Sequence, residues 1–256
     1  MPAVIQGLTL EQWHQRYRQQ AAWTETIRQH LFAKARPQPG EPILEVGSGT
    51  SAVLEQIQQS NGQHLYGIDI NRASLLFSKE KSPDFLLTEA DGFELPFPNN
   101  CFAISFCHYL LLWIENPVHI LKEMLRVTRP GGVVIALAEP DHAARIDYPP
   151  PLDELGHLQT ESLKQQGVNI KMGRKLGEVF NQAGLSNIEI GILGAQWSVN
   201  HAGVSDDTEW MTLRSDLADK LPETDIARYE AIDQQAKQAG SRILFIPTFY
   251  ALGFAV

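Results

Sequence analysis

A short run, Ile-Leu-Glu-Val-Gly-Ser-Gly at residues 43–49, constrains the fold more than any other part of this 256-residue chain. Its apolar half predicts a buried strand, and Gly47 and Gly49 predict a sharp turn where a side chain would obstruct. A helix is expected to begin directly after the turn, near Thr50. Such a turn lets a nucleotide-like ligand lie against bare backbone. Glu45 should point into the same crevice, where its charge would repel a pyrophosphate and attract a cationic amine.

The composition and net charge narrow the range of partners. A chain that is 43% hydrophobic and 20% charged is long enough for one large domain with a substantial core. The net charge of -9 disfavours nucleic acids and anionic lipid surfaces as partners. No apolar segment approaches the ~20 residues that span a bilayer, so we expect no membrane insertion and a cytoplasmic location. Cys101 and Cys107 flank a predicted buried strand, which favours two reduced thiols over a disulfide or a zinc site.

Predicted strands and helices alternate along the middle of the chain. Strands are expected at 43–46, 64–69, 85–90, 102–107 and 133–138, with helices between them at 51–60, 73–81 and 117–128. This alternation predicts a parallel sheet that is covered by helices on both faces.

The flanking segments are mainly helical. Residues 9–31 carry apolar side chains at helical spacing, and the proline-rich run 35–42 ends that pattern. Beyond residue 140 we expect a loop at 141–151, helices at 152–166, 173–183, 206–221 and 222–239, and a strand at 188–193. The last apolar stretch, 243–256, suits a final strand at or beside the sheet edge.

The glycine turn admits two classes of ligand. Residues 47–52 fit the dinucleotide pattern Gly-x-Gly-x-x-Gly/Ala, and Asp69 follows Gly49 by 20 residues at the end of the second predicted strand. These two facts leave an NAD(P)-dependent oxidoreductase open.

Three acids at the ends of three consecutive predicted strands favour the other class. Glu45 would attract an ammonium group, Asp69 a ribose diol and Asp91 the exocyclic amine of adenine. In addition, none of the six tyrosines is followed four residues later by lysine, the pair that short-chain dehydrogenases use for proton transfer. A ligand that presents all three groups is S-adenosylmethionine.

The chain resembles the class I S-adenosylmethionine-dependent methyltransferases, in particular the small-molecule group that includes the quinone-biosynthesis type. The matching segments lie within residues 43–140 and are Glu45-Val46-Gly47-Ser48-Gly49-Thr50, Gly67-Ile68-Asp69-Ile70, Asp91-Gly92-Phe93-Glu94-Leu95-Pro96-Phe97 and Leu125-Arg126-Val127-Thr128-Arg129-Pro130-Gly131-Gly132. One departure is Ser51, where the family usually has a third glycine. A serine is expected to be small enough for the helix start to approach the ligand.

The resemblance implies an α/β fold, a doubly wound, seven-stranded Rossmann-like sheet with its last strand antiparallel and with helical cap elements. Residues 1–256 would form a single methyltransferase domain. Within it we expect an N-terminal helical cap at 1–36, a cofactor-binding core at 43–140, substrate-side helices and loops at 141–240, and the final strand at 243–256.

The resemblance also implies a set of cofactor-binding residues. These are Tyr17 reaching in from the N-terminal helix, Glu45 for the ammonium, Gly47, Ser48 and Gly49 for the methionine portion, Asp69 for the ribose, Ile70 and Phe93 on the two faces of adenine, Asp91 and Gly92 beside its amine, and Cys107 near the sulfonium. An aspartate at a strand end equally often caps a helix, and Phe93 alone would be a core residue.

Catalysis of methyl transfer needs mainly alignment of nucleophile, methyl and sulfur. If the acceptor is a hydroxyl or a protonated amine, a base helps, and His108 after the fourth predicted strand is our candidate catalytic residue. The alternative is that His108 only shapes the pocket. His142 is a second option; together with Glu139 and Asp141 it could hold a divalent metal, but the spacing fits no strong template and no metal is expected.

The acceptor should be recognised by the aromatic-rich segments outside the core. These include Trp13, Trp23, residues 109–113, the loop at 145–151 and the helical pair with Trp210 and Tyr229. They favour a small, partly apolar methyl acceptor. The predicted function is methyl transfer from S-adenosylmethionine to such a molecule; the alternatives are an NAD(P)-dependent oxidoreductase and a non-catalytic cofactor-binding module. Neither the acceptor nor the oligomeric state follows from the sequence.

Overall fold

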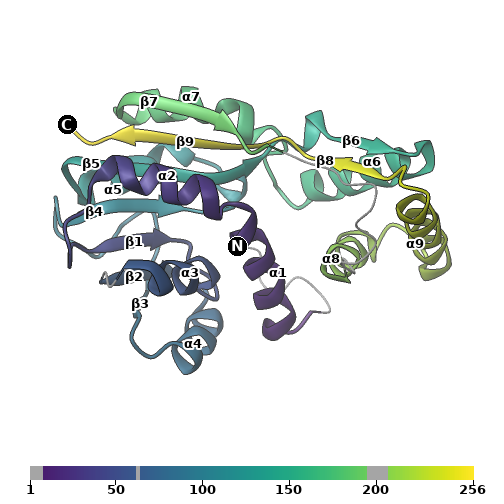
Figure 1. Ribbon diagram of the computed structural model, residues 1–256, viewed down its shortest axis with the longest axis horizontal. Helices are drawn as coiled ribbons and strands as arrows, with labels where there is room; N and C mark the ends of the chain where they lie inside the picture. The colour runs from purple at the N-terminus through teal and green to yellow at the C-terminus, as the bar shows by residue number, and fades with distance from the viewer. Residues whose placement is uncertain (1–7, 62–63, 195–206) are drawn as a thin grey trace.

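A seven-stranded mixed sheet forms the centre of the molecule (Figure 1). The computed structural model describes residues 8–61, 64–194 and 207–256. In spatial order the strands are β3 (Leu86–Glu89), β2 (Leu65–Asp69), β1 (Ile43–Val46), β4 (Phe102–Cys107), β5 (Thr128–Pro140), β9 (Thr248–Phe254) and β7 (Ser186–Ile192). Strands β1 to β5 are mutually parallel, and β9 runs antiparallel to both of its neighbours. The predicted doubly wound sheet with an antiparallel last strand is therefore confirmed.

The central strands are apolar on both faces because helices cover both. Every residue of β1 and β4 is buried, as expected for the middle of a parallel sheet. Alternate residues of β5 enter different cores: Val134 and Ala136 join one cluster, and Val133 and Ile135 join the other. The first cluster includes α5 (Pro117–Val127) and α7 (Met172–Ala183), and the second includes α2 (Glu25–Ala35) and α3 (Ala52–Asn61). Helix α4 (Arg72–Lys81) packs beside β2 and β3.

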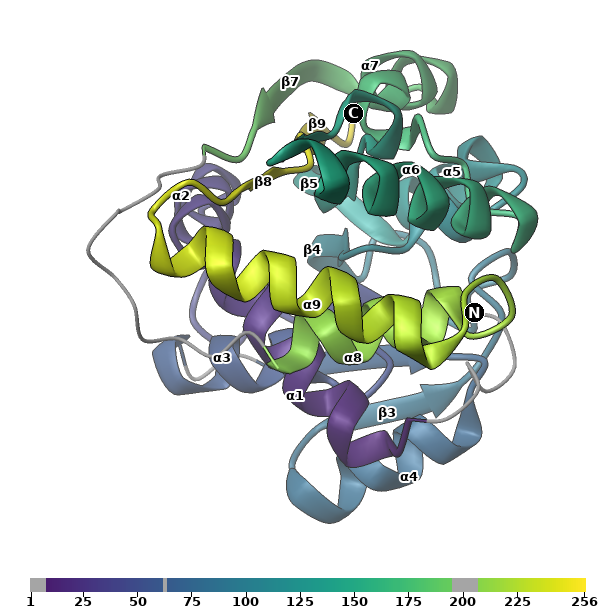
Figure 2. The same cartoon turned by 90° about the vertical axis from the view of Figure 1, so that its right-hand side faces the viewer.

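A second group of elements, which we call the distal cap, lies beyond one end of the sheet (Figure 1). It consists of η2 (His142–Ala144), β6 (Ile146–Tyr148), α6 (Pro150–Gln165), α8 (Asp207–Leu217), α9 (Glu223–Gln238) and β8 (Ile243–Phe245). Its own apolar core contains Leu152, Leu155, Trp210, Leu213, Leu217, Ile226 and Tyr229. Figure 2 shows α8 and α9 crossing in front of the sheet, with α6 on one side and α1 (Leu10–Trp23) on the other.

The distal cap differs from its sequence prediction in two places. Residues 141–151, expected to be a loop, contain β6, and 243–256, expected to be one strand, contain both β8 and β9. Pro247 separates these two strands, because proline has no amide hydrogen to continue a ladder. Strand β8 pairs with β6 in a separate two-stranded sheet, while β9 enters the main sheet between β5 and the edge strand β7.

Other element boundaries shift by a few residues. Helix α8 ends at Leu217, four residues earlier than predicted, and the predicted start at Asp206 lies outside the described residues. Strand β5 is longer than predicted at both ends. None of the helices in the described part of the chain combines the length and apolar character needed to cross a bilayer.

Candidate cofactor and acceptor site

A cavity of about 970 Å³ lies at the carboxyl ends of the parallel strands, a size typical of ligand pockets. Its wall combines the turn after β1 (Glu45, Gly47, Ser48, Gly49, Thr50), helix α1 (Leu10, Trp13, Arg16, Tyr17, Gln20, Trp23), the segment after β4 (His108, Tyr109, Leu112, Trp113) and the distal cap (Gln159, Glu209, Thr212, Asp216, Lys237, Arg242). The predicted residues Tyr17, Glu45, Gly47, Ser48, Gly49 and His108 therefore share one cavity.

The glycine turn takes the conformation that its sequence predicts. Gly47 and Gly49 have φ values of +74° and +50°, in the left-handed region that side chains disfavour. A Cβ atom at Gly47 would lie 2.8 Å from Leu110 Cδ1. The amides of Gly47 and Ser48 donate to the Ile68 carbonyl at 2.9 and 2.8 Å, which anchors the turn to β2. The two glycines thus present backbone without side chains to the cavity, and the hydrogen bonds to β2 fix the position of the turn.

Ser51 shows why the family usually has glycine at this position. Its φ is +59°, so a residue with a side chain occupies the left-handed region directly before α3. Serine is small, but its cost at this position is conformational, about 1 kcal/mol. The Ser51 hydroxyl is also fully buried and lacks a hydrogen-bond partner among the described residues.

Glu45 is a buried acid with an unused oxygen. Its side chain is 2% exposed, and Oε2 has no hydrogen-bond partner in the described structure. Burial raises the pKa of Glu45 well above its usual value, while the buried guanidinium of Arg28 acts in the opposite direction. A buried carboxyl group without full compensation is costly, so its position at the cavity wall suits a cationic ligand group.

The Asp69 carboxylate connects the glycine turn to the turn that follows β2. Its Oδ2 accepts from the Gly49 amide and its Oδ1 from the Asn71 amide, both at 2.8 Å, and the side chain is buried. Asp69 does not itself line the cavity. In the structure it positions the glycine turn, and its contact with a ribose stays a prediction.

The residues predicted around the adenine lie outside the cavity wall. Asp91 is exposed, and its Oδ1 accepts from the Phe93 amide at 2.9 Å. Phe93 packs edge-on against His119 with ring centres 5.2 Å apart. Ile70 is 55% exposed, and a Cβ atom at Gly92 would lie 3.2 Å from Val46. These four residues are not part of the cavity wall, although Gly92 lies beside Val46 next to the glycine turn, so their contact with adenine also remains a prediction.

The end of β4 brings one predicted residue to the cavity and buries another. Cys107 is fully buried, lies outside the cavity wall and is a free thiol; burial raises its pKa. Cys101 is a half-buried free thiol. His108 lines the cavity, with Nε2 3.4 Å from Thr24 Oγ1. Burial and the nearby Arg28 lower the pKa of His108 to about 3, so its imidazole is neutral and a weak base.

Glu139 has a structural role that the sequence analysis missed. Its Oε1 accepts from the amides of Leu110 and Leu111 at 3.1 and 2.8 Å, and its Oε2 accepts from Leu112 at 2.9 Å. This carboxylate holds the single turn η1 (Leu111–Trp113), which begins two residues after Tyr109, whose φ of +51° is strained. The signal in the sequence was an acid at the end of a fully apolar strand.

Asp141 and His142, the other two residues suggested as metal ligands, also lie in separate environments. Asp141 is paired with Arg174, and His142 lines the cavity with its Nδ1 lacking a partner among the residues described. Burial lowers the pKa of His142 to about 4. Nowhere in residues 8–61, 64–194 and 207–256 do three or more such side chains converge as metal ligands would.

Comparisons with known proteins match this architecture. A family model described as "Methyltransferase domain" matches residues 44–136. The demethylmenaquinone methyltransferase of Renibacterium salmoninarum is 33% identical over 104 residues, which cover 41% of this chain and 43% of that protein. The chain spans less than half the length of the first curated relatives that it matches.

Two solved structures share the fold at low identity. The phosphoethanolamine N-methyltransferase 2 of Haemonchus contortus, in complex with S-adenosyl-L-methionine, has a TM-score of 0.56 and 14% identity, covering 90% of this chain and 52% of that one. The [4+2]-cyclase SpnF has a TM-score of 0.58 and 17% identity, covering 90% and 81%.

Residues 44–136 match a methyltransferase domain, and they lie in the predicted seven-stranded sheet. The resemblance to methyltransferases predicted from the sequence is therefore confirmed. The methyltransferase domain supplies the glycine turn and the segment after β4, whereas α1 and the distal cap, which complete the cavity, lie outside the matched residues.

Helix α1 covers the glycine turn of the methyltransferase domain. Tyr17 lines the cavity, as predicted, and stacks on Trp13 with ring centres 5.5 Å apart. Burial and the charge of Asp69 raise the pKa of the Tyr17 phenol. His14, which the sequence analysis did not select, contacts Thr50 of the glycine turn. A histidine between Trp13 and Tyr17, on a helix with apolar residues at regular spacing, was the available signal.

The distal cap faces the cavity with a polar side of α8. Glu209, Thr212 and Asp216 follow one another at helical spacing and line the cavity. The predicted helical pair does line the cavity, but its aromatic residues Trp210 and Tyr229 are buried in the cap's own core. Neighbouring residues on a helix point in different directions, so the aromatic side packs inward and the polar side faces the ligand space.

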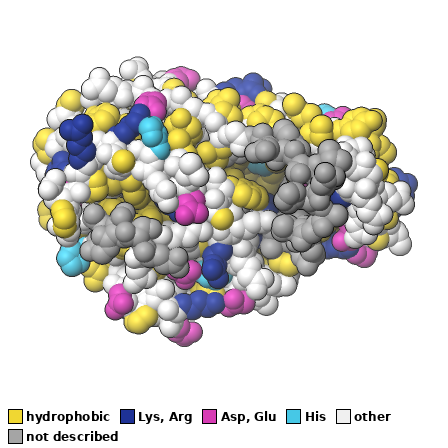
Figure 3. Space-filling view, in the orientation of Figure 1, with side chains coloured by type: hydrophobic (Ala, Val, Ile, Leu, Met, Phe, Trp, Pro, Cys, Tyr) yellow, Lys and Arg dark blue, Asp and Glu magenta, His cyan; other side chains and the backbone are white. Residues whose placement is uncertain are grey.

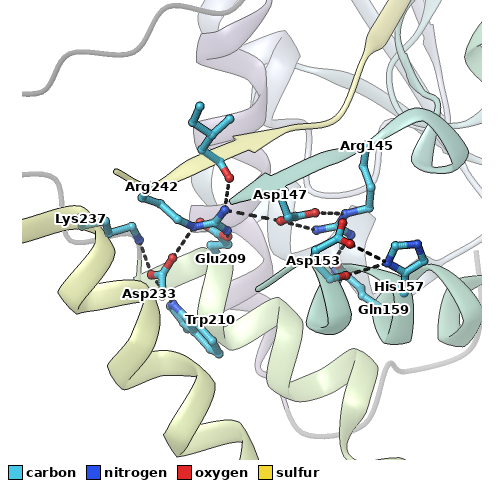
Figure 4. A network of polar contacts seen from close by, with 11 residues as sticks. Arg145, Asp147, Asp153, His157, Gln159, Glu209, Trp210, Asp233, Lys237 and Arg242 are labelled. Carbon is cyan, nitrogen blue, oxygen red and sulfur yellow. Dashed lines mark hydrogen bonds and ion pairs between the residues drawn. The ribbon is translucent and has the colours of Figure 1, made fainter. Parts of the chain in front are cut away.

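An ion-pair network links the elements of the distal cap (Figure 4). Arg242 lies between Asp147 of β6, Asp233 of α9 and Glu209 of α8, and Asp147 also pairs with Arg145. Lys237 pairs with Asp233 at 2.8 Å. The two cations of this network that reach the cavity, Lys237 and Arg242, are thus already compensated by carboxylates.

Proposed function

We propose that this protein transfers a methyl group from S-adenosylmethionine to a small-molecule acceptor. The observation that carries the proposal is Glu45: a buried carboxyl group with an unused oxygen at the wall of a large cavity, beside two glycines in the left-handed conformation. An ammonium group would compensate this carboxylate, whereas a pyrophosphate would be repelled by it.

Several residues would hold the cofactor. Gly47 and Gly49 leave room for its methionine portion, Glu45 would bind its ammonium, and Tyr17 would close over it from α1. Asp69 fixes the Gly49 amide and is our candidate for the ribose. When bound, S-adenosylmethionine supplies a methyl group on a sulfonium, whose leaving thioether needs no proton. The chain's task is therefore to orient the acceptor and exclude water.

His108 remains the candidate residue beside the reacting atoms. With a pKa of about 3 its imidazole is neutral and accepts a hydrogen bond readily, but it removes a proton poorly. We therefore assign His108 an orienting role toward the acceptor in preference to full proton removal, and retain general-base catalysis as the predicted alternative.

The acceptor is proposed to be an uncharged molecule with an aromatic or apolar body. Trp13, Trp23, Tyr109 and Trp113 give the cavity an aromatic wall. The cap cations that reach the cavity are compensated by carboxylates, which leaves little attraction for a phosphate. The basic and acidic side chains on the face in Figure 3 are intermingled, which supports the prediction that nucleic acid is not a partner. A single domain and a cytoplasmic location are further parts of this proposal.

A second candidate is a cofactor-binding protein that does not transfer methyl groups. It is favoured by the similarity to SpnF, a protein named a [4+2]-cyclase that has the same fold. The oxidoreductase alternative is opposed by the unused Glu45 oxygen, since a pyrophosphate at the glycine turn would leave that carboxyl uncompensated.

Two measurements separate these candidates. Isothermal titration with S-adenosylhomocysteine, S-adenosylmethionine and NAD should show binding of the first two and none of the third; the reverse result would overturn the proposal. Methyl-labelled S-adenosylmethionine is then incubated with the protein and neutral or phosphorylated fractions of a metabolite extract. Label should appear in a neutral product, whereas cofactor binding without any labelled product would favour the non-transferring candidate.

A further inference from the structure

Helix α1 covers the cavity with few buried side chains, and several of its polar contacts, such as Glu11 with Lys81, lie at the surface. Of its 14 residues only His14 and Ala21 are buried. The helix begins with a capping box between Thr9 and Gln12, so its start is well defined, yet its side chains contribute little to the core. A segment with so few buried contacts opens at low free-energy cost. The buried contacts at His14 and Ala21 therefore have a large share in holding it closed, and the contact at Ala21 lies at the far end of the helix, where Arg28 donates to the Ala21 carbonyl.

His14 makes its contact at the glycine turn. Its side chain is 3% exposed, and Nδ1 lies 2.9 Å from the Thr50 hydroxyl, which lines the cavity. Its other ring nitrogen, Nε2, lies 3.5 Å from Oε2 of Glu55 on α3. The ring also packs edge-on against Phe77 of α4, with ring centres 5.3 Å apart. Three separate elements thus enclose one imidazole.

The surroundings define the direction of the hydrogen bond. Because Nε2 faces a carboxylate, the neutral imidazole carries its proton there, and Nδ1 accepts the proton of the Thr50 hydroxyl. Tyr17 lies three residues further along α1 and reaches the cavity. The same turn of helix therefore joins the glycine turn at His14 and covers the ligand space at Tyr17.

We infer that His14 is a positioning residue for cofactor binding: through Thr50 it fixes α1 on the glycine turn, so that Tyr17 closes over the bound cofactor. This inference rests on the proposed function, because it assumes a ligand at the glycine turn. A cofactor held under α1 leaves only when the helix lifts. His14 then controls how long the ligand stays more than how fast it arrives.

Stopped-flow fluorescence of the full chain tests this inference, with S-adenosylhomocysteine as the probe and Trp13 and Trp23 of α1 as reporters. His14→Leu removes the hydrogen bond and should speed dissociation about five-fold, the size expected for one neutral hydrogen bond, with a smaller change in association. His14→Asn keeps an acceptor at the position of Nδ1 and should restore dissociation to within about two-fold of the parent, although asparagine is the poorer helix former.

Two further variants make the result specific to the contact. His30→Leu is the matched control, since His30 is exposed on α2, and it should dissociate like the parent. Thr50→Val removes the partner hydroxyl and should resemble His14→Leu, and the double variant should be no faster than either single one. Equal dissociation from the parent and His14→Leu would overturn the inference, as would equal effects of His14→Leu and His30→Leu. If the parent chain itself does not bind the probe, the proposed function has failed instead.

Discussion

The glycine-turn side of the cavity and the distal cap differ in how completely their buried polar groups are paired. Around the turn, Glu45 Oε2 and the hydroxyls of Ser48 and Ser51 have no hydrogen-bond partner within the described ranges. In the described part of the cap, only His142 Nδ1 among buried side-chain atoms lacks a partner, and Arg242 contacts three carboxylates. Polar groups without partners lower stability and await a ligand, whereas linked ones hold their own elements together. The first region is therefore built for binding at a cost in stability, and the second uses its charges for structure.

The largest effect is expected from breaking the cap network. Arg242→Ala should destabilise the cap by about 3 kcal/mol, because Asp147 and Asp233 stay buried with less compensation. Urea unfolding followed by the fluorescence of Trp210, in the cap core, should show this loss. Binding of S-adenosylhomocysteine at the glycine turn should persist in the variant.

The matched control for Arg242→Ala is Lys164→Ala, on α6 of the same cap. Lys164 forms an exposed ion pair with Glu161 at 3.9 Å, so the change should be below about 0.5 kcal/mol. If Arg242→Ala also abolishes binding at the glycine turn, the two regions are not separable and the comparison between them fails.

Glu45→Gln should have the next largest effect. It should weaken cofactor binding and, in alkaline buffer, raise the stability of the ligand-free protein. Affinity for S-adenosylhomocysteine should fall by about 2 kcal/mol, roughly 30-fold, because the ammonium loses its buried carboxylate. Arg28→Gln is unsuitable as a control, since Arg28 compensates the same carboxylate. Glu123→Gln, an acid that pairs with Arg126 away from the cavity, should leave affinity unchanged.

The pH dependence of Glu45 follows from its raised pKa. The stability that Glu45 provides to the ligand-free protein is fully present below its ordinary pKa, and it is lost as pH rises through the raised value. In alkaline buffer Glu45→Gln should therefore be more stable than the parent chain. Titration calorimetry in buffers of different ionisation enthalpy should show proton release on binding by the parent only. Equal proton release by both proteins would mean that another group titrates.

The same two regions show what the sequence could and could not predict. The glycine turn follows from local rules, since strand periodicity and the φ preference of glycine act within a few residues. The β6–β8 pairing joins Ile146 to Phe245, and no local pattern indicates which distant segment completes such a short strand. The His14–Thr50 contact spans 36 residues and depends on how α1 packs against α3. Local geometry was predictable, whereas contacts between distant elements needed the structure.

Ser51 offers the finest test of the glycine-turn side, because two separate costs meet in one residue. Ser51→Gly should stabilise the protein by about 1 kcal/mol, since glycine adopts a φ of +59° without strain. Ser51→Ala keeps the strained backbone and removes only the buried hydroxyl that lacks a partner. Thermal unfolding should therefore rank glycine above alanine and alanine above serine. If both variants gain stability and bind S-adenosylhomocysteine as the parent does, the hydroxyl has no part in binding. If both bind more weakly, the buried hydroxyl contributes to ligand binding. Ser51 at the start of α3 then resembles Glu45, since each lowers the stability of the free protein and strengthens binding.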